Sequence, residues 1–246
     1  MIDGDGRFCR LEHAEALDLV TSLPPDSVDL AYVDPPFFTG RDHGAFDDRW
    51  PDGLASFVGA LVERLAPLVT RLTPSGSLYV HLDWRTVHHV KVALDDVFGA
   101  ASFLNEIIWS YGLGGSGKRW WPRKHDTILW YVRDPSQHWF EAPRVPARSR
   151  RLAGQDKKAP DVWDIPAINN MARERTGYPT QKPLALLERI VASSCPPGGV
   201  VLDPYCGSGT TCEAAERLGR SWIAGDRSAE AIATTKRRLA AVHGSG

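Results

Sequence analysis

Four consecutive residues at the end of an apolar run could together bind a planar amino compound. The stretch "DPPF" occupies residues 34–37 and directly follows "VDLAYV". The Asp34 carboxylate can accept hydrogen bonds from an amino group, and the ring of Phe37 offers a flat face on which a base can stack. Pro35 and Pro36 have a fixed φ and no backbone N–H, so the loop is stiff and its carbonyls are free to face a ligand. Because "DPP" can also simply end a strand, this motif needs independent support.

A second motif, "VLDPYCGSGTT" at residues 201–211, has the features of a cofactor-binding turn. An apolar strand ends at Asp203, and Gly207 and Gly209 then permit a tight turn and close approach of the backbone to a ligand. The next apolar run ends at Asp226, where a carboxylate can accept hydrogen bonds from ribose hydroxyls. The pattern lacks GxxxxGK[ST], so it is not an NTP-binding P-loop. The sequence therefore predicts a nucleoside-containing cofactor, with a purely structural glycine turn as the alternative.

Both motifs lie at the ends of predicted strands in a chain that alternates strands with helices. Apolar runs typical of buried strands occur at 7–12, 28–33, 76–82, 105–111, 127–132, 199–203 and 221–226. Helical spacing of apolar residues occurs at 54–72, 182–194, 210–219 and 228–242. We therefore expect an α/β fold, a Rossmann-like and mostly parallel twisted sheet with helices on both faces. The runs at 105–111 and 127–132 have no helix between them, which predicts an antiparallel hairpin at one edge.

The composition narrows the class of protein. The length of 246 residues suits a single α/β domain. A net charge of −1 and a pI of about 6.7 do not indicate what class of molecule the protein binds. We expect neither a signal peptide nor a membrane span, because no apolar run is long enough and none follows a basic start. The cysteines Cys9, Cys195, Cys206 and Cys212 lack metal-binding spacing. We therefore expect no metal site, and reduced thiols in a cytoplasmic protein.

These motifs resemble those of a known family, the amino-methylating DNA methyltransferases that use S-adenosylmethionine. "DPPF" matches the family's catalytic pattern [DNS]-PP-[YFW], and "LDPYCGSGTT" is similar to its cofactor loop, D-P-F-x-G-S-G-T-T. "TGYPTQKPLALLERI" at 176–190 looks like a further cofactor segment, and "GSLYVHLD" and "KHDTILWYV" resemble intermediate strands. The catalytic motif precedes the cofactor loop, which is the order of the permuted β class. The resemblance covers nearly the whole chain and is weakest from about 134 to 175.

The resemblance implies a circularly permuted class I methyltransferase fold in three parts. Residues 1–133 would form the catalytic half, 134–175 a small inserted target-recognition region, and 176–246 the cofactor-binding half. The implied cofactor is S-adenosylmethionine. Its implied binding residues are Asp203, Pro204, Tyr205, Cys206, Gly207, Ser208, Gly209, Thr210, Thr211 and Asp226, with Thr180, Gln181 and Lys182 at its methionine end. Where the family often has Gly-Asp near the cofactor adenine, this chain reads "LEHAEAL", with Glu12 and Glu15 as the nearest acids.

The implied reaction is site-specific methyl transfer to the exocyclic N6 of an adenine flipped out of double-stranded DNA. Asp34 and the Pro35 carbonyl would accept the two N–H groups, while Pro36 and Phe37 complete the catalytic motif and the ring stacks on the base. C5-cytosine chemistry is disfavoured because Cys195 stands in the order Cys-Pro. N4 of cytosine is the nearest alternative, although that branch of the family more often carries Ser in place of Asp34. RNA adenine methylation and an inactive DNA-binding protein are further alternatives.

A basic stretch predicts where nucleic acid would bind. Residues 112–182 hold 14 Lys/Arg against 7 Asp/Glu in a chain that is otherwise acidic. "GLGGSG" at 112–117 matches a dinucleotide fingerprint, but the following "KRWWPRKHD" is too short and proline-broken for the required helix. We expect instead a DNA-binding loop, or else a hairpin tip packed on the core, with a second basic set further along. The residues are Lys118, Arg119, Trp120, Trp121, Arg123 and Lys124, then Arg144, Arg148, Arg150 and Arg151. The sequence leaves the oligomeric state open, a homodimer included.

Overall fold

The computed structural model describes residues 7–42, 44, 48–112, 117–147, 154–169 and 171–243, and an eight-stranded sheet forms its centre. The strand order is β1-β10-β9-β2-β3-β5-β4-β8. The strands are β1 (Cys9–His13), β2 (Val28–Val33), β3 (Leu72–Leu82), β4 (Phe103–Ser110), β5 (His125–Val132), β8 (Val162–Asp164), β9 (Val200–Asp203) and β10 (Ser221–Asp226). β5 runs antiparallel to both of its neighbours, and all other pairs in this sheet are parallel. The predicted α/β class with an antiparallel hairpin is confirmed.

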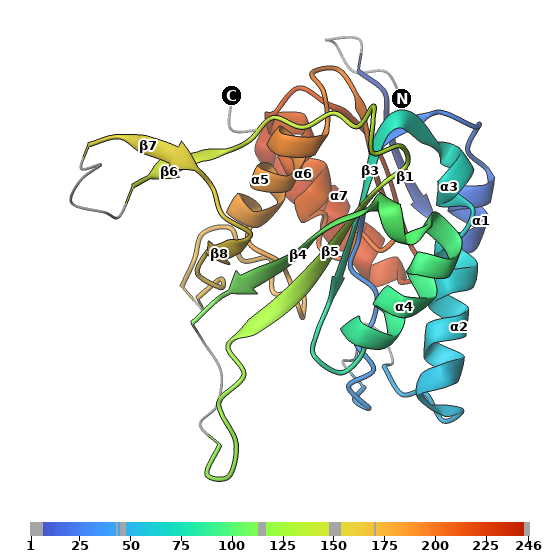
Figure 1. The fold of residues 1–246 in the computed structure, drawn as a ribbon, viewed down its shortest axis with the longest axis vertical. Helices are drawn as coiled ribbons and strands as arrows, with labels where there is room; N and C mark the ends of the chain where they lie inside the picture. The colour runs from blue at the N-terminus through green and yellow to red at the C-terminus, as the bar shows by residue number, and fades with distance from the viewer. Residues whose placement is uncertain are drawn as a thin grey trace.

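Helices cover both faces of the sheet (Figure 1). One face carries α1 (Ala16–Thr21), α2 (Gly53–Leu65), α3 (Leu68–Arg71) and α4 (Val87–Phe98), and the other carries α5 (Leu184–Ser194), α6 (Thr210–Arg217) and α7 (Ala229–His243). A short 3₁₀ helix, Ala100–Ser102, precedes β4. Side chains alternate along the buried strands, so Leu30 and Tyr32 belong to one core cluster, and Ala31 and Val33 belong to the other.

The helix predicted at 54–72 is divided in two. Pro67 lacks a backbone N–H, and α2 therefore ends before it while α3 restarts after it. Among the described residues, Gly53–Arg71 is the one helical stretch whose length and composition would allow a membrane span. Its Phe57, Leu61 and Leu65 are buried in the core against the sheet. Packing on the sheet thus accounts for the apolar character of this stretch.

The segment between β5 and α5 is partly built into the domain and partly projects from it. β8 pairs with β4, with Trp163 opposite Trp109, and so supplies the edge strand of the main sheet. Upstream of β8, β6 (Arg144–Pro146) and β7 (Asp156–Lys158) form a separate antiparallel ribbon. This ribbon extends away from the body of the molecule (Figure 1).

The topology brings several strand ends to one edge of the sheet. β10, β9, β2 and β3 are consecutive parallel strands, so Asp226, Asp203 and Asp34 follow neighbouring carboxyl ends. β4 is antiparallel to β5, which is itself antiparallel to β3, and the hairpin between β4 and β5 therefore leaves from the same edge. Ligands of open α/β sheets bind beyond this edge. We therefore expect the functional site at this edge of the sheet.

Candidate active site

A single cavity at the carboxyl edge joins the two motifs. It encloses about 1250 Å³, counting the open solvent at its mouth. Asp34, Pro35, Pro36 and Phe37 line it together with every residue of the 203–211 turn except Gly209, and with Thr180, Gln181, Lys182 and Asp226. β2 and β9 are hydrogen-bonded neighbours, with Ala31 opposite Leu202, which explains how residues distant in sequence face one space. Of the two acids considered for the cofactor adenine, Glu15 lines the cavity, whereas Glu12 pairs with Arg10 at 2.6 Å.

Among the described residues, one carboxylate oxygen of Asp34 accepts a hydrogen bond within the protein, and the other does not. Its Oδ2 accepts a hydrogen bond from the Nζ of Lys182 at 2.5 Å. Its Oδ1 is buried and has no hydrogen-bond partner in the part of the chain that the structure describes. Leaving a buried acceptor unpaired costs about 1–3 kcal/mol, more for a charged group. An oxygen held in this condition at a cavity wall is suited to accept a hydrogen from a ligand.

Phe37 is held between an imidazole and an ammonium group. Its ring lies 5.7 Å from the ring of His81, centroid to centroid, at an interplanar angle of 32°. The Nζ of Lys182 lies 4.9 Å from the centroid of Phe37, within the range of a cation–π contact. Lys182 thus contacts both functional groups of the DPPF motif.

A buried chain of polar side chains lies behind Phe37. The hydroxyl of Tyr32 and Nδ1 of His81 are 2.7 Å apart, and Nε2 of His81 lies 3.2 Å from a carboxylate oxygen of Asp126. Burial raises the pKa of Tyr32, and nearby Asp34 raises it further. Burial alone would raise the pKa of Asp126, but the hydrogen bond and charge of His81, with Lys182 nearby, bring that pKa below its usual value. These contacts fix the His81 ring against which Phe37 packs.

The sequence reasoning missed His81 and Asp126. His81 interrupts the apolar run at 78–82, and Asp126 directly precedes the buried run at 127–132, where a polar residue needs a partner to be buried. That interruption was the available signal. It could not reveal that Asp126 is the partner of His81. That contact depends on β3 lying beside β5 with His81 opposite Ile128, which follows from the order of strands in the sheet.

The loop after the DPPF motif is fastened by Asp48, which the sequence reasoning also missed. The carboxylate of Asp48 accepts hydrogen bonds from the backbone N–H groups of Phe38 and Thr39, both at 2.8 Å. Asp48 is buried, and Phe38 has a positive φ of 59°, a conformation that a bulky residue rarely adopts. The carboxylate therefore holds a tight turn that directs the preceding residues into the cavity.

The glycine turn is organised around Asp226. Its two carboxylate oxygens accept hydrogen bonds from the backbone N–H groups of Gly207, at 3.0 Å, and Ser228, at 2.8 Å. Each oxygen keeps a further lone pair. Burial raises the pKa of Asp226, and the two backbone hydrogen bonds oppose that shift. Asp226 thus positions the turn and can still accept a ligand hydroxyl.

The two glycines of the turn have different roles. Gly207 has a φ of 48° and faces the cavity, where a Cβ would lie 3.1 Å from the ring of Tyr178. Gly209 has a φ of 76°, and a Cβ there would lie 2.7 Å from Cγ2 of Thr235 in α7. The close approach that Gly209 permits is therefore to a helix of the same chain, and α6 begins directly after it.

Asp203 is a buried acid at the base of the turn. Its Oδ1 accepts a hydrogen bond from the backbone N–H of Tyr205 at 3.0 Å. Burial raises the pKa of Asp203 to about 7, with the charges of Asp34 and Asp226 acting in the same direction. The hydrogen bonds from Thr211 and Tyr205 act in the opposite direction. Folding therefore favours the protonated form of Asp203.

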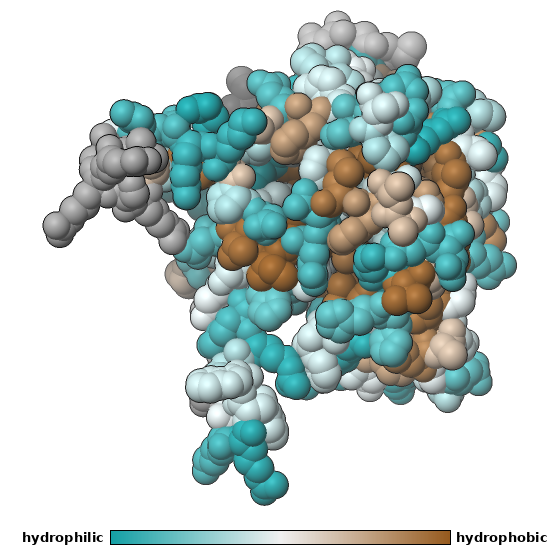
Figure 2. Space-filling view, viewed as in Figure 1, coloured by the Kyte–Doolittle hydropathy of each residue, from teal (hydrophilic) through white to brown (hydrophobic). Residues whose placement is uncertain are grey.

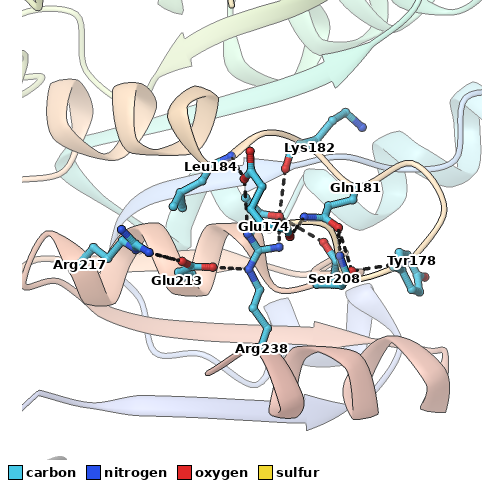
Figure 3. A network of polar contacts seen from close by, with 11 residues as sticks. Glu174, Tyr178, Gln181, Lys182, Leu184, Ser208, Glu213, Arg217 and Arg238 are labelled. Carbon is cyan, nitrogen blue, oxygen red and sulfur yellow. Dashed lines mark hydrogen bonds and ion pairs between the residues drawn. The ribbon is translucent and has the colours of Figure 1, made fainter. Parts of the chain in front are cut away.

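A buried ion network holds the Thr180–Lys182 segment against the glycine turn (Figure 3). Arg238 in α7 pairs with Glu213 in α6, and one of its nitrogens bonds Oγ1 of Thr210 at 3.0 Å. That hydroxyl donates to the backbone carbonyl of Lys182 at 3.2 Å. Arg238 also lies 3.9 Å from the carboxylate of Glu174. Helices α6 and α7 thereby fix the backbone from which Lys182 reaches Asp34.

The side chains of the 180–182 segment point in different directions. The amide of Gln181 accepts from Thr176 at 2.8 Å and donates to the carbonyl of Glu174 at 2.7 Å, so it stabilises its own loop. Lys182 reaches into the cavity toward Asp34. Thr180 has a φ of 60°, which is unusual for a β-branched residue. All three residues line the cavity, but the polar ends of Gln181 and Lys182 contact the protein.

The predicted DNA-binding residues that the structure describes do not line the cavity. The described part of the hairpin before β5 is exposed, with Trp120 61% and Trp121 92% accessible. It projects from the body of the molecule and is coloured from teal to near-white in Figure 2, without brown. Arg144 is exposed on β6, whereas Arg148, Arg150 and Arg151 lie outside the described residues. The exposed tryptophans of the hairpin do not pack on the core.

Comparison with known proteins places the chain in a family. Residues 28–237 match the family described as DNA methylase, which groups N6 and N4 methyltransferases. The "DNA adenine methyltransferase YhdJ" of Escherichia coli (strain K12) is 32% identical to this chain, over 92% of this chain and 81% of that protein. This chain belongs to the DNA methylase family. The predicted family is thereby confirmed.

Solved structures of DNA methylases share the fold. The "PvuII DNA methyltransferase (cytosine-N4-specific)" superposes with a TM-score of 0.74 at 18% identity, covering 94% of this chain and 88% of the other. The "M1.HpyAVI-SAM complex" gives a TM-score of 0.65 at 25% identity, covering 94% and 99%. These likenesses confirm the Rossmann-like methyltransferase fold. Groups of three or more potential metal ligands are absent from the described residues of this DNA methylase.

Proposed function

We propose that this DNA methylase transfers a methyl group from S-adenosylmethionine to the exocyclic N6 of an adenine flipped out of duplex DNA. The observation that carries the proposal is the buried Oδ1 of Asp34, which has no partner among the described residues and shares its cavity with the glycine turn. An amino group supplies the donor that this oxygen lacks. The name of the Escherichia coli relative supports adenine as the target.

The cavity suits a cationic nucleoside that carries no phosphate. Carboxylates outnumber lysine and arginine side chains in its lining by five to three; the acids are Glu15, Asp34, Asp48, Asp203 and Asp226, and the bases are Arg64, Lys182 and Arg227. Such a lining is more favourable for a cation than for the phosphates of a dinucleotide or nucleoside triphosphate. S-adenosylmethionine has a sulfonium charge, an α-amino group and ribose hydroxyls. Asp226 would accept from the ribose, and Glu15 lies on the same wall to contact the adenosine end.

When bound, S-adenosylmethionine would supply an electrophilic methyl group on its sulfonium; the target amine would gain that methyl group and release one proton, leaving S-adenosylhomocysteine as the second product. Asp34 Oδ1 accepts one N–H of the target amino group, and the carbonyl of Pro35 accepts the other. These two hydrogen bonds favour a more tetrahedral nitrogen. Its lone pair then points out of the plane of the base, toward the methyl group. Phe37 holds the extruded ring by stacking, which contributes roughly 1–3 kcal/mol. The chain thus acts chiefly by positioning.

Lys182 acts at Asp34 in this account, rather than at the methionine end of the cofactor. Its ammonium neutralises Oδ2 and leaves Oδ1 for the substrate. Because the same ammonium lies near the face of Phe37, a base stacking on that face requires the flexible lysine stem to shift. The ion pair is therefore expected to keep the empty site ordered until the base enters.

N4 of cytosine is the second candidate target. Its amino group offers the same two N–H groups to Asp34 and Pro35, and the PvuII enzyme that shares the fold is named for this specificity. At 18% identity that likeness concerns the fold alone. Direct identification of the methylated base decides between the two amines.

The decisive experiment incubates the protein with tritiated S-adenosylmethionine and either duplex DNA or RNA, and then separates the nucleosides. We expect label in N6-methyladenine from DNA. Asp34→Ala should reduce transfer by at least about 10²-fold while S-adenosylmethionine binding stays near the wild-type level. Asp34→Asn, which keeps an acceptor oxygen, should retain more activity than Asp34→Ala. Label confined to N4-methylcytosine or to RNA, or wild-type turnover in Asp34→Ala, would contradict the proposal.

We also propose the division of labour within the chain. Residues 1–133 supply the catalytic motif, 176–246 supply most of the cofactor contacts, and 134–175 read the target site. The projecting β6–β7 ribbon supports the last assignment, because it carries Arg144, Lys157 and Lys158 with exposed side chains. Substituting these three by alanine should change the methylated sequence or reduce selectivity, as sequencing of methylated positions would measure.

We further propose that the protein acts on nucleoid DNA in a reducing cytoplasm. Cys195, Cys206 and Cys212 are buried free thiols. Burial raises the pKa of Cys195 to about 12, and it raises the pKa of the other two thiols as well. Protonated, buried thiols of this kind are inert structural groups.

A further inference from the structure

An exposed tryptophan at the carboxyl edge makes cation–π contacts with two guanidinium groups. Trp84, 44% accessible, lies in the turn between β3 and α4. The guanidinium carbon of Arg123 lies 3.7 Å from the centroid of its ring, and that of Arg85 lies 4.9 Å away. Arg123 comes from the projecting hairpin, so this stack ties the hairpin to the body of the domain.

The Trp84 stack lies beside the layer that supports the proposed base-binding ring. Trp84 follows the end of β3 by two residues, and the ring of His81, the next-to-last residue of that strand, lies 5.7 Å from the ring of Phe37, centroid to centroid. Between them, Asp83 binds Arg85 through the backbone N–H at 2.8 Å and through the guanidinium. The stack does not line the cavity itself, but it lies at the same carboxyl edge, on the turn that follows the strand supporting Phe37.

The two arginines of the stack differ in what they can still bind. The carboxylate of Asp83 engages Arg85. Arg123 is exposed, and the described residues include no carboxylate that pairs with it. A guanidinium stacked on indole keeps its N–H groups in the plane of the fork, where they match the two oxygens of a phosphate. Arg123 is thus an oriented and unneutralised anion site.

We propose that Trp84 positions Arg123 as a phosphate clamp at the carboxyl edge beside the cavity, and that this clamp binds the backbone of the DNA strand that carries the target base. The proposal rests on the proposed function, because a base enters the cavity only if its flanking phosphates lie at the mouth. Arg123 contacts the phosphate, and Trp84 is a positioning residue. A phosphate contact of this type fixes the register of the strand without reading its sequence.

The test compares DNA binding by fluorescence anisotropy over a range of salt concentrations, using a fluorescent duplex of mixed sequence. Arg123→Ala should weaken binding about tenfold and reduce the slope of log K against log salt by about one. Arg123→Lys keeps the charge but loses the planar stack, so it should keep the slope while still losing affinity. Lys236→Ala, which removes an exposed charge from α7, is the matched control and should change neither quantity.

Trp84 is tested through its effect on Arg123. Trp84→Ala should raise the KM for DNA several-fold with little change in kcat, and it should leave S-adenosylmethionine binding and the melting temperature unchanged. Trp84→Phe should restore part of the loss, because phenylalanine also binds cations. A merely structural role for Trp84 would instead lower the melting temperature and change kcat and cofactor binding together.

The clamp and the proposed function fail in different ways. If the wild-type protein labels DNA while Arg123→Ala and Trp84→Ala bind it with unchanged affinity and slope, the clamp is refuted alone. An equal loss in the Lys236→Ala control, or a loss seen with RNA but not with duplex DNA, would also refute it. If the wild-type protein labels no DNA, the proposed function fails, and the anisotropy series still decides whether Arg123 binds the DNA backbone.

Discussion

The packed wall around the cavity and the two projecting arms use charged residues in opposite ways. The wall comprises the residues that line the cavity and the Arg238–Glu213 pair behind them, and the arms are the described part of the hairpin, 117–124, and the β6–β7 ribbon. At the wall, Arg238, Glu213 and Lys182 are buried or nearly so, and each has a partner within the chain. On the arms, Arg119 and Lys158 are exposed, and the described residues include no acid that pairs with either. The charged residues of the wall pair with one another and hold the geometry of the site. Exposed residues of the arms such as Arg119 and Lys158 remain available to bind a polyanion.

This difference separates stability from recognition. A substitution in the wall is expected to lower stability and to move Lys182 or the glycine turn. A substitution on an arm is expected to change DNA binding and its salt dependence while the fold remains intact. Substitutions in the two regions test that separation.

Arg238→Met removes the buried guanidinium of the wall and leaves Glu213 charged and only partly compensated. Breaking such a pair costs about 3–5 kcal/mol, which denaturant unfolding can measure. Arg217→Ala is the matched control, because Arg217 contacts the same carboxylate at 2.8 Å but is half exposed. An exposed pair contributes about 0–1 kcal/mol. Equal losses in the two variants would show that the wall is no more tightly held than the surface.

Asp203 should make stability depend on pH. Its pKa rises to about 7 in the folded protein from an ordinary 3.8, so folding favours the protonated form. This contribution is fully present below about pH 4 and is lost as the pH rises through 7, a change of about 3 kcal/mol between pH 5 and 8. Asp203→Asn, which keeps an acceptor for the Tyr205 N–H, should lose less stability over this range. If the free energy of unfolding changed with pH by the same amount in the variant and the wild type, that result would argue against a buried ionisable Asp203.

Gly209→Ala should reveal the contact between the turn and α7. The new Cβ meets Thr235 at 2.7 Å in addition to the strain of a positive φ. Gly219→Ala is the control, since its φ of 68° is similar but its Cβ would enter open space. We expect Gly209→Ala to lose about 1–3 kcal/mol more than the control in thermal unfolding. If both variants lost the same amount, backbone strain alone would account for the glycine.

Arg119→Ala should have the smallest effect on the fold. As a surface change on the hairpin it should alter the free energy of unfolding by no more than about 0.5 kcal/mol. It should nevertheless weaken DNA binding and reduce the salt slope by about one, as measured by anisotropy. An unchanged slope would remove this part of the hairpin from the interface.

The sequence predicted the parts of the site that depend on local chemistry. The ends of the strands at Val33, Asp203 and Asp226 follow from apolar runs that stop at an acid, and the structure has strands ending at each of these points. Parallel strands bring such ends to one edge, so the shared cavity was foreseeable. The start of α6 after Gly209 and the cap of α7 by Ser228, which bonds the N–H of Ala231 at 3.3 Å, are also local.

The remaining features depend on contacts between distant segments. Nothing in the residues around Arg238 indicates that it would be buried beside Glu213, because each looks like a solvated charge on a helix. Asp48 holds the turn after Phe37 from ten residues away, and its neighbours carry no recognisable motif. β8 was not predicted because three residues with one buried tryptophan are too short to show a period.

The measurement closest to the central claim is a crystal structure of the protein with S-adenosylhomocysteine and duplex DNA. The account predicts one cavity that holds both ligands, with a flipped adenine stacked on Phe37 and its N6 within hydrogen-bonding distance of Asp34 Oδ1. The sulfur should lie on the side of the glycine turn. A cofactor bound away from Gly207 and Asp226, or an extruded base held without Asp34, would contradict the account.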